Sequence, residues 1–303
     1  MLTQSAARRR AGGATFARVS TPVPTQAAKA ERFLALHHGD TPLLMPNPWD
    51  AGSARLLAYV GFPALATTSS GFAATLGRLD GSVTRDEALA HAAAVVDAVD
   101  VPVSADLENC FAHDPAGVAE TAAGALDAGL AGFSVEDYAG APGDRTDDRG
   151  IYEKGLAVER VAAAVEVAHA GPVHAVVTAR AENHIRGVGD MDDTIARLQA
   201  YQEVGADVLF APGLSTADDL RRLVSSVDHP INVLALPATP PVADLAELGV
   251  GRVSVGGGFA RAALAAVVEA GRELLDEGTY GYWDRVIASR PVIDAAFAPR
   301  GGR

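Results

Sequence analysis

Hydrophobic and polar positions follow one repeating pattern along this chain, in which a short apolar run precedes a longer segment of helical periodicity. The pattern starts near residue 30 and recurs to about residue 277. The eight apolar runs predicted as strands are residues 43–49, 63–68, 101–109, 132–135, 173–179, 207–210, 231–236 and 252–255. Because a helical segment separates successive runs, the strands are expected to be parallel and joined by helical crossovers.

Eight strand–helix units predict a (β/α)8 TIM barrel of the α/β class, with extra C-terminal helices. A doubly wound open sheet is the alternative. The barrel is preferred because charged residues end several successive strands, whereas an open sheet would gather them at one switch point. The expected organisation is a disordered tail over 1–29, a barrel catalytic domain over 30–279, and an accessory helix and tail over 280–303. A transit peptide is the alternative for the arginine-containing tail.

Polar residues at the helix starts predict where several helices begin. Asp50 is expected to cap one helix, and Thr84 with Glu87 forms a capping-box pattern for another. Asp114 precedes a proline suited to the first helical turn, and Ser215 is expected to cap a later helix. The segment 69–72, after the second strand, is expected to lead into a loop.

Charge and cysteine content narrow the function classes. The 303-residue chain has a formal net charge of −13, which argues against a nucleic-acid partner. Its single cysteine, Cys110, excludes an intrachain disulfide and a cysteine-based zinc cluster. No apolar run reaches the roughly eighteen residues of a membrane span. The expected location is therefore the cytoplasm, without a membrane partner.

The strand ends carry the candidate chemistry. Asp106 and Glu108 are two residues apart at the end of the third strand, so they are expected to face the same side. Two such acids repel unless a cation lies beside them, and Mg²⁺ or Mn²⁺ takes oxygen ligands of this kind. Glu136 follows the next strand and Arg180 ends the one after it. The alternative is a structural role in which the two acids pair with Arg180 across the barrel mouth.

Four motifs on successive strands, taken together, resemble the isocitrate lyase/phosphoenolpyruvate mutase superfamily over about residues 30–285. They are Thr68-Ser-Ser-Gly-Phe72, Ser104-Ala-Asp-Leu-Glu-Asn109, Val135-Glu-Asp137 and Thr178-Ala-Arg-Ala-Glu-Asn-His184. The resemblance implies a Mg²⁺ site, with Mn²⁺ as the alternative ion. Its implied inner and water-mediated ligands are Asp106, Glu108 and Glu136.

The resemblance also implies substrate-binding and catalytic roles. The substrate-binding residues would be Ser70, Gly71, Phe72, Arg180 and Asn183, and the catalytic residues would be Asp80, Arg180 and Glu136. Ser70 and Gly71, with the Phe72 amide, would cradle the carboxylate of a 2-oxo acid. Alternatives are an ordinary turn at 70–71, a plain salt bridge at Arg180 and a loop role for Asn183. Gly256-Gly-Gly258 is a minor candidate for phosphate binding.

The activity implied is a Mg²⁺-dependent lyase, decarboxylase or hydrolase that cleaves a carbon–carbon or phosphorus–carbon bond at C3 of a small 2-oxo acid, through a metal-stabilised enolate. The loop 138–155 lacks the Lys-Lys-Cys-Gly-His sequence of the isocitrate and methylisocitrate lyases and has one lysine, Lys154. The phosphonomutase loop pattern is not evident at 138–143 either. Alternatives are a phosphoenolpyruvate mutase-like (carboxyvinyl-carboxyphosphonate phosphorylmutase-like) phosphonomutase, a metal-dependent aldolase and a non-catalytic carboxylate-binding barrel.

The resemblance finally implies a homo-oligomer, either a dimer or a tetramer built as a dimer of dimers. In such an assembly the last barrel helix, near residues 259–277, would be exchanged between subunits. Its alanine-rich sequence permits close packing.

Overall fold

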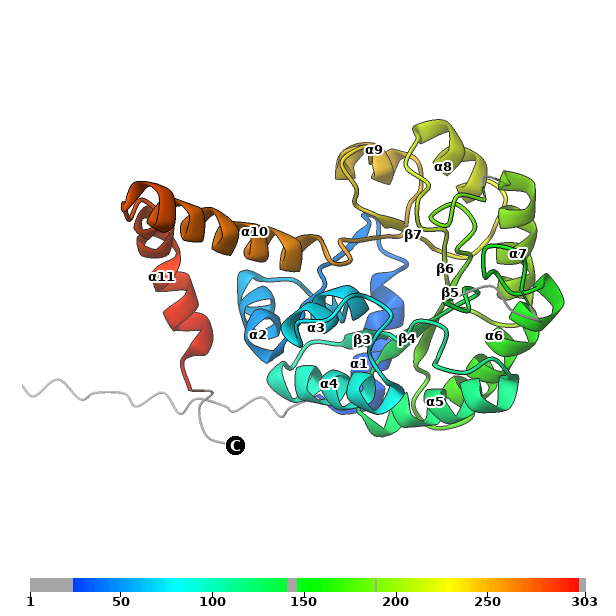
Figure 1. Ribbon diagram of the computed structural model, residues 1–303. Helices are drawn as coiled ribbons and strands as arrows, with labels where there is room; N and C mark the ends of the chain where they lie inside the picture. The colour runs from blue at the N-terminus through cyan, green and yellow to red at the C-terminus, as the bar shows by residue number, and fades with distance from the viewer. Residues whose placement is uncertain (1–23, 141–145, 189, 300–303) are drawn as a thin grey trace, which may run out of the picture.

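A computed structural model describes residues 24–140, 146–188 and 190–299, in which eight parallel strands form a barrel surrounded by helices (Figure 1). Most of the predicted tail, residues 1–23, lies outside the described residues. The strands are β1 (Leu43–Met45), β2 (Leu65–Ala66), β3 (Val103–Asp106), β4 (Gly132–Glu136), β5 (Val176–Arg180), β6 (Val208–Phe210), β7 (Ile231–Leu234) and β8 (Arg252–Ser254). They pair in the order β1-β8-β7-β6-β5-β4-β3-β2.

The barrel is nearly closed between its first two strands. Although β1 and β2 form no ladder, the Ala66 amide donates to the Pro46 carbonyl at 3.2 Å across the seam. The predicted fold class is therefore confirmed as an α/β barrel with C-terminal helices, and the open-sheet alternative is wrong. β1 ends earlier than the predicted run 43–49 because Pro46 and Pro48 have no amide hydrogen for the ladder.

The helices follow the strands in the predicted order. They are α1 (Gln26–Leu36), α2 (Ala51–Val60), α3 (Ser69–Thr75), α4 (Arg85–Ala98), α5 (Pro115–Asp127), α6 (Lys154–His169), α7 (Met191–Glu203), α8 (Ala217–Val224), α9 (Val242–Glu247), α10 (Gly258–Arg272) and α11 (Trp283–Phe297), with a π-helical turn η1 (Glu273–Glu277) after α10. None of the described helices is long and apolar enough to cross a membrane.

Capping side chains fix several helix starts, as the sequence predicted. Asp50 caps α2, Thr84 and Glu87 form the capping box of α4, and Asp114 caps α5. The prediction for Ser215 was wrong, because Thr216 caps α8 by accepting from the Asp219 amide at 3.2 Å. The segment 69–72 after β2 does lead into a loop, but the sequence did not predict the short helix α3 that precedes this loop and whose start is capped by the Thr68 side chain.

Helix α1 closes the N-terminal end of the barrel. Its Phe33 side chain is fully buried against Gly132, where an added Cβ atom would lie 2.9 Å from the Phe33 ring and 2.6 Å from the Val176 carbonyl oxygen. His37 of α1 is buried as well, and its Nε2 lies 3.2 Å from Nη1 of Arg252 inside the barrel. The opposite, C-terminal end of the strands is left for the site.

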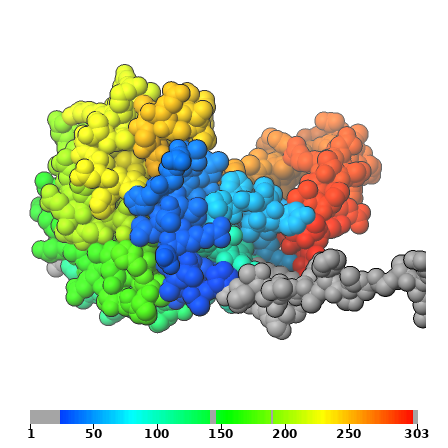
Figure 2. Space-filling view, turned by 180° about the vertical axis from the view of Figure 1, so that it is seen from behind, coloured from blue at the N-terminus to red at the C-terminus, as the bar shows by residue number. Residues whose placement is uncertain are grey.

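The last two helices leave the barrel. Figure 1 shows α10 running away from the barrel, and Figure 2 shows α10 and α11 at one side of it, next to the segment that carries α2. α11 returns toward α2, where Arg55 donates to the carbonyls of Ala296 and Ala298 at 3.0 and 2.8 Å. The Arg55 guanidinium also lies over the Phe297 ring. We call α10, η1 and α11 together the C-terminal arm.

Candidate active site

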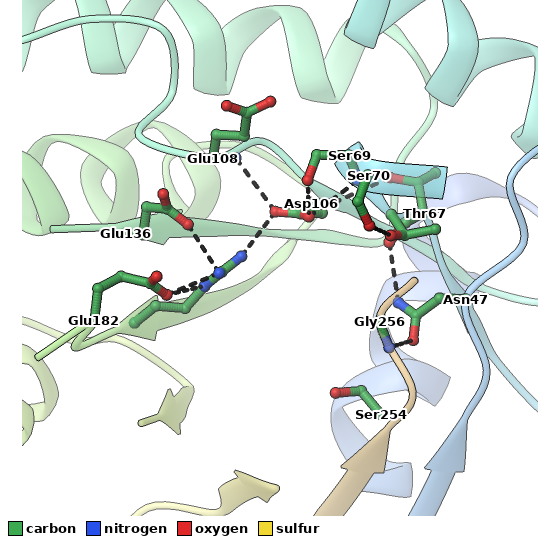
Figure 3. A network of polar contacts seen from close by, with 12 residues as sticks. Asn47, Thr67, Ser69, Ser70, Asp106, Glu108, Glu136, Glu182, Ser254 and Gly256 are labelled. Atoms are coloured by element: carbon green, nitrogen blue, oxygen red, sulfur yellow. Dashed lines mark hydrogen bonds and ion pairs between the residues drawn. The ribbon is translucent and has the colours of Figure 1, made fainter. Parts of the chain in front are cut away.

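Asp106 is the centre of a polar network at the C-terminal end of β3 (Figure 3). Its Oδ2 accepts from the Ser69 amide at 3.1 Å and from the Ser69 hydroxyl at 2.8 Å. Its Oδ1 accepts from Nη1 of Arg180 at 2.8 Å, and its own amide donates to the Thr67 hydroxyl at 3.1 Å. Groups from α3 and β5 therefore fix the Asp106 carboxylate at the barrel mouth, and Thr67, just after β2, fixes its backbone.

Arg180 contacts three carboxylates at once. Besides Asp106, its Nη2 lies 2.9 Å from Glu136 Oε2 and 2.8 Å from Glu182 Oε1. Burial alone would lower the pKa of Arg180, but Glu136, Glu182 and Asp106 together raise that pKa well above its usual value. The guanidinium thus stays charged, and it holds strand-end acids from β3 and β4 around one point.

Glu108 differs from the other two predicted metal ligands because Arg180 does not pair with it. Its φ is +51°, in the left-handed region that non-glycine residues rarely adopt. Its Oε1 is buried and has no hydrogen-bond partner among the described residues. Burial, followed by the charges of Asp106 and Asp80, raises the pKa of Glu108 to about 7. A cation beside this carboxylate would offset both the energetic cost of its burial and the repulsion from Asp106 and Asp80.

Glu136 is buried at the end of β4, and burial raises the pKa of its carboxyl group well above the usual value despite the nearby Arg180 charge. Its backbone is fixed from α6. Nη1 of Arg160 donates to the Glu136 carbonyl at 2.9 Å, and Nη2 donates to the carbonyls of Asn109 and Ala112. One buried arginine therefore holds the ends of both acid-bearing strands.

Asp137, next to Glu136 in the motif, faces away from the mouth and supports the site. Its carboxylate accepts from Arg197 at 3.1 Å, from the Tyr201 hydroxyl at 2.8 Å and from the Glu182 amide at 2.8 Å. Burial raises the pKa of Asp137, while Arg197 lowers it. Asp137 thereby fixes the segment that carries Glu182.

The predicted carboxylate cradle lies at the start of α3. The amides of Gly71 and Phe72 donate within the helix start, to the Thr68 hydroxyl at 3.4 Å and the Thr68 carbonyl at 3.0 Å. A Cβ atom at Gly71 would lie 2.5 Å from Thr68 Cγ2, so packing alone accounts for that glycine. Ser70 does reach the mouth, with its hydroxyl 3.2 Å from the Thr68 hydroxyl. The cradle remains a prediction, carried mainly by Ser70.

Two adjoining cavities of about 400 Å³ each open at the mouth. Ser69, Asp80 and Arg180 line both of them, which places the predicted acid Asp80 beside the network. The second cavity also contains Glu108 and Glu136. The first extends downward between the strands, where it is lined by Ser104, Ser134, Thr178, Asn232, Arg252 and Ser254.

Asn183 is not among the residues that line these cavities. Its side chain is buried, and its Nδ2 donates to Asp193 Oδ2 of α7 at 2.6 Å. Of the predicted substrate residues, the structure therefore brings Ser70 and Arg180 to the mouth and turns Asn183 toward α7.

Four residues near the network had no role in the sequence-based prediction: Asn47, Thr67, Ser69 and Glu182. Glu182 lies two residues after Arg180, a spacing that could have suggested a shared partner. Asn47 joins three strands, because its Nδ2 donates to the Thr67 carbonyl at 3.0 Å while its Oδ1 accepts from the amides of Val255 and Gly256 at 2.9 and 2.8 Å. No local pattern marks such a bridge.

The donor set fits a hard divalent cation. Asp106, Glu108 and Glu136 offer carboxylate oxygens, which Mg²⁺ and Mn²⁺ prefer, and the buried Glu108 Oε1 lacks a partner. The ligand atoms of these three acids do not all lie within 4.8 Å of one another. Among the described residues, the group that meets this distance is His169, His174 and Asp207, near the starts of β5 and β6. A partly hydrated ion suits the wider spacing, because Mg²⁺ usually keeps several waters.

Comparison with protein families matches residues 33–275 to the family described as phosphoenolpyruvate phosphomutase. This match covers more than half of the chain. The chain belongs to this family. It is thus a member of the phosphoenolpyruvate mutase/isocitrate lyase superfamily, as the four motifs predicted. Members of the superfamily are lyases, hydrolases and mutases that act on small oxo acids.

Three similar proteins illustrate the range. An uncharacterised protein of Mycobacterium tuberculosis (strain H37Rv) is 32% identical over 246 residues, covering 80% of this chain and 89% of that protein. The 2-methylisocitrate lyase of Escherichia coli (strain K12) is 32% identical over 214 residues, covering 69% and 71%. A crystal structure from Burkholderia cenocepacia J2315, described as a "putative lyase/mutase", is 47% identical with a TM-score of 0.85, covering 90% of this chain and 98% of that one.

Proposed function

We propose that this protein is a Mg²⁺-dependent enzyme that cleaves a carbon–carbon or phosphorus–carbon bond at C3 of a small 2-oxo acid. The observation that carries the proposal is the group of strand-end carboxylates at the barrel mouth, in which Glu136 is buried, Asp106 and Glu108 are partly buried and the pKa of Glu108 and of Glu136 is raised, beside a cavity large enough for such an acid. Maintaining acids in this state costs folding free energy, and such perturbed groups concentrate at functional sites.

Each residue at the mouth has a role that its contacts support. Asp106, Glu108 and Glu136 would hold the ion. When bound, the ion would polarise the 2-oxo group and stabilise the negative charge that develops as the bond breaks. Ser69 would keep the Asp106 carboxylate oriented through its amide and hydroxyl. Arg180 would bind an anionic group of the substrate or of the product.

Cleavage at C3 needs a group that exchanges a proton with that carbon. Asp80 lines both cavities and is the candidate. Cys110 cannot take this role, because it is fully buried and burial raises the pKa of its thiol to about 12. Acid–base chemistry by a cysteine, as implied for the isocitrate lyases, therefore does not extend to this chain.

A phosphonomutase is the second candidate, and Arg186 is the observation that favours it. A phosphoryl group needs positive charge around it while it is transferred, because its oxygens are negatively charged. Arg186 lines the second cavity together with Arg180, 3.2 Å from Glu182 and stacked over the Tyr138 ring. Two cations on one side of that cavity would suit a phosphonate as well as a carboxylate.

The test is product formation by the full chain. Oxaloacetate, phosphonopyruvate and substituted malates are offered separately with Mg²⁺ or with EDTA, pyruvate is followed with lactate dehydrogenase, and all products are identified by NMR. Asp106→Ala should reduce the metal-dependent rate by about 10³-fold, because it removes a metal ligand and leaves Arg180 with one partner fewer.

Asp86→Ala is the matched control, since the Asp86 side chain is exposed on α4 and should keep the full rate. A rate that persists in EDTA, or that is equal in Asp106→Ala and the native chain, would contradict the proposal. Isomerisation of phosphonopyruvate in place of cleavage would select the mutase.

The arm supports the further proposal that the protein is a homo-oligomer with exchanged arms. Leu44 points outward from β1 and is 39% exposed, beside an apolar groove of about 650 Å³ that Val60 and Val242 also line. In a closed barrel a helix covers this outer face, but α10 runs away from it (Figure 1). The apolar residues of α10 in a second copy would cover it.

A further inference from the structure

Arg252 lies inside the barrel, on the lower part of β8. Its side chain is 3% exposed, and three of its contacts are neutral acceptors. Nε donates to Asn232 Oδ1 at 2.8 Å, and Nη1 approaches the Thr178 hydroxyl at 3.1 Å and His37 Nε2 at 3.2 Å. Nη2 has no hydrogen-bond partner among the described residues.

No carboxylate of the described residues pairs with Arg252, in contrast to Arg180, which has three. An uncompensated charge inside a protein costs several kcal/mol, so such charges are normally paired. Thr178, which contacts Arg252, is two residues before Arg180 on β5, so the backbone of Arg180 lies only about 7 Å further along the strand. Burial and the charge of Arg180 lower the pKa of Arg252 to about 9, and the group remains a cation at neutral pH.

The space above Arg252 is part of the first cavity, whose lining includes several hydroxyl groups. Barrel interiors are usually filled by bulky branched side chains. Here several strands place small hydroxyl residues in that layer instead, namely Ser104, Ser134, Thr178 and Ser254. The guanidinium at the bottom of the cavity therefore opens onto a hydroxyl-lined space that continues to the mouth.

We propose that this barrel floor, formed by Arg252, Asn232 and the surrounding hydroxyls, is an anion-binding site distinct from the carboxylate network at the mouth. Its ligand would have the size and chemistry of a halide or a single carboxylate group. The site does not depend on the proposed reaction.

The donors at the floor favour an anion over other ligands. A guanidinium has hydrogen-bond donors only, and hydroxyl groups can turn to donate as well. A metal cation is excluded by the charge of Arg252. Asp106 and Glu136, the strand-end acids above, are held by Arg180 and do not reach Arg252. An anion would supply the missing counter-charge.

Crystals of the full chain soaked in sodium bromide test the site directly through the anomalous scattering of bromine. The proposal expects a peak within hydrogen-bonding distance of the Arg252 guanidinium, absent from Arg252→Met. In solution, saturating bromide should raise the Tm of the native chain by about 3 °C relative to gluconate at equal ionic strength. Arg252→Lys should keep part of that shift, and Arg252→Met should lose it.

Arg85→Met is the control, because Arg85 is an exposed arginine of α4 and should leave the bromide shift unchanged. If Arg252→Met does not fold, the site is still tested by the bromine peak in the native crystal and by the bromide-induced Tm shift of Arg252→Lys. Peaks confined to surface arginines or to Arg180, or a peak that persists in Arg252→Met, would identify an adventitious ion only and overturn the proposal.

The anion has two candidate sources, a free inorganic ion and a carboxylate of a bound organic acid. Oxalate and the longer oxaloacetate are therefore added to bromide-soaked crystals. Loss of the floor peak with oxaloacetate but not with oxalate would assign the site to a second carboxylate of the substrate. A peak that survives both acids would assign it to a free ion. Each result supports an anion site.

Discussion

At the scale of single residues, the mouth of the barrel is a balance between charges that one arginine cannot fully neutralise. Arg180 contacts Asp106, Glu136 and Glu182, while Glu108 keeps a buried oxygen without a partner. Each raised acid pKa means that the folded chain disfavours the ionised form. Such a site gains most from a divalent cation, which is the physical basis of the proposed metal dependence.

His37, at the other end of the barrel, gives a pH prediction that does not involve the metal site. Its Nδ1 donates to the Phe33 carbonyl at 2.8 Å, and its Nε2 lies against Arg252, so the ring is neutral. Burial, and next the charge of Arg252, lower the pKa of His37 from 6.5 to about 3. Below pH 6.5 the unfolded chain binds a proton that the folded chain does not, so stability falls as the pH decreases toward 3.

We therefore expect His37→Gln to lose this part of the acid sensitivity. Between pH 8 and pH 5, the native chain should lose about 2 kcal/mol of unfolding free energy through His37, and the variant should not. Urea unfolding of both proteins at the two pH values measures the difference. His38→Gln, at the exposed neighbouring position, is the control. A gap between His37→Gln and the native chain that is equal at both pH values would refute the assignment.

At the scale of elements, the contact between α1 and β4 explains why a glycine begins the strand. A methyl group at position 132 would meet the Val176 carbonyl oxygen at 2.6 Å and the Phe33 ring at 2.9 Å. Neither the strand backbone nor a fully buried ring can move away easily. We expect Gly132→Ala to lower the unfolding free energy by about 2 kcal/mol, measured by urea unfolding.

Gly155→Ala is the matched control, because it lies in the first turn of α6 with no atom within 4 Å of the added methyl group. This substitution should be neutral or stabilise by about 0.5 kcal/mol through helix propensity. Equal effects of the two substitutions would show that α1 does not plug the barrel as the structure indicates.

The elements also show which local signals were sufficient. Capping residues fixed the starts of α2, α4 and α5 because a cap is satisfied within four residues of sequence. Every strand except β4 is shorter than its apolar run, since a strand ends where its ladder ends, and the ladder depends on a neighbour distant in sequence. The start of α8 was misplaced by one residue because Ser215 and Thr216 are both good caps.

At the scale of the whole molecule, the C-terminal arm has apolar side chains that a single chain does not bury. Side chains of its apolar residues are exposed, among them Val267 at 68%, Leu275 at 85% and Ile287 at 66%. Monomeric proteins rarely expose so large an apolar surface. We expect the protein to have at least twice the mass of one chain in solution, measured by light scattering after size exclusion.

Val267→Glu should shift that assembly toward the single chain, because it places a charge in the buried interface. An increase of about 100-fold or more in the dissociation constant is expected. Glu269→Gln, on the same helix, changes a polar residue that faces Arg285 and should leave the mass unchanged. A native chain that elutes with the mass of one copy would contradict the assembly.

The site itself could be predicted in part. Asp106 ends β3, but Glu108 lies beyond the strand with a left-handed backbone, so the period of two used in the prediction does not apply to it. The shared edge of parallel strands does bring Glu136 and Arg180 near Asp106. The sequence could not predict two sets of contacts. These are the salt bridge between Arg180 and Glu182 and the hydrogen bonds from Arg160 to the carbonyls of three separate residues. Those contacts depend on side-chain rotamers and on the register between strands.

The sequence by itself determined the class of fold, the order of its elements and the edge of the sheet where the acids gather. Those features follow from hydrophobic periodicity and capping, which act over a few neighbouring residues. Only the tertiary structure decided that Arg252 lies uncompensated below the mouth and that the arm leaves the barrel. The surroundings of Arg252 depend on packing α1, β5 and β7 against β8, and this packing of elements distant in the sequence sets which charges lack a partner.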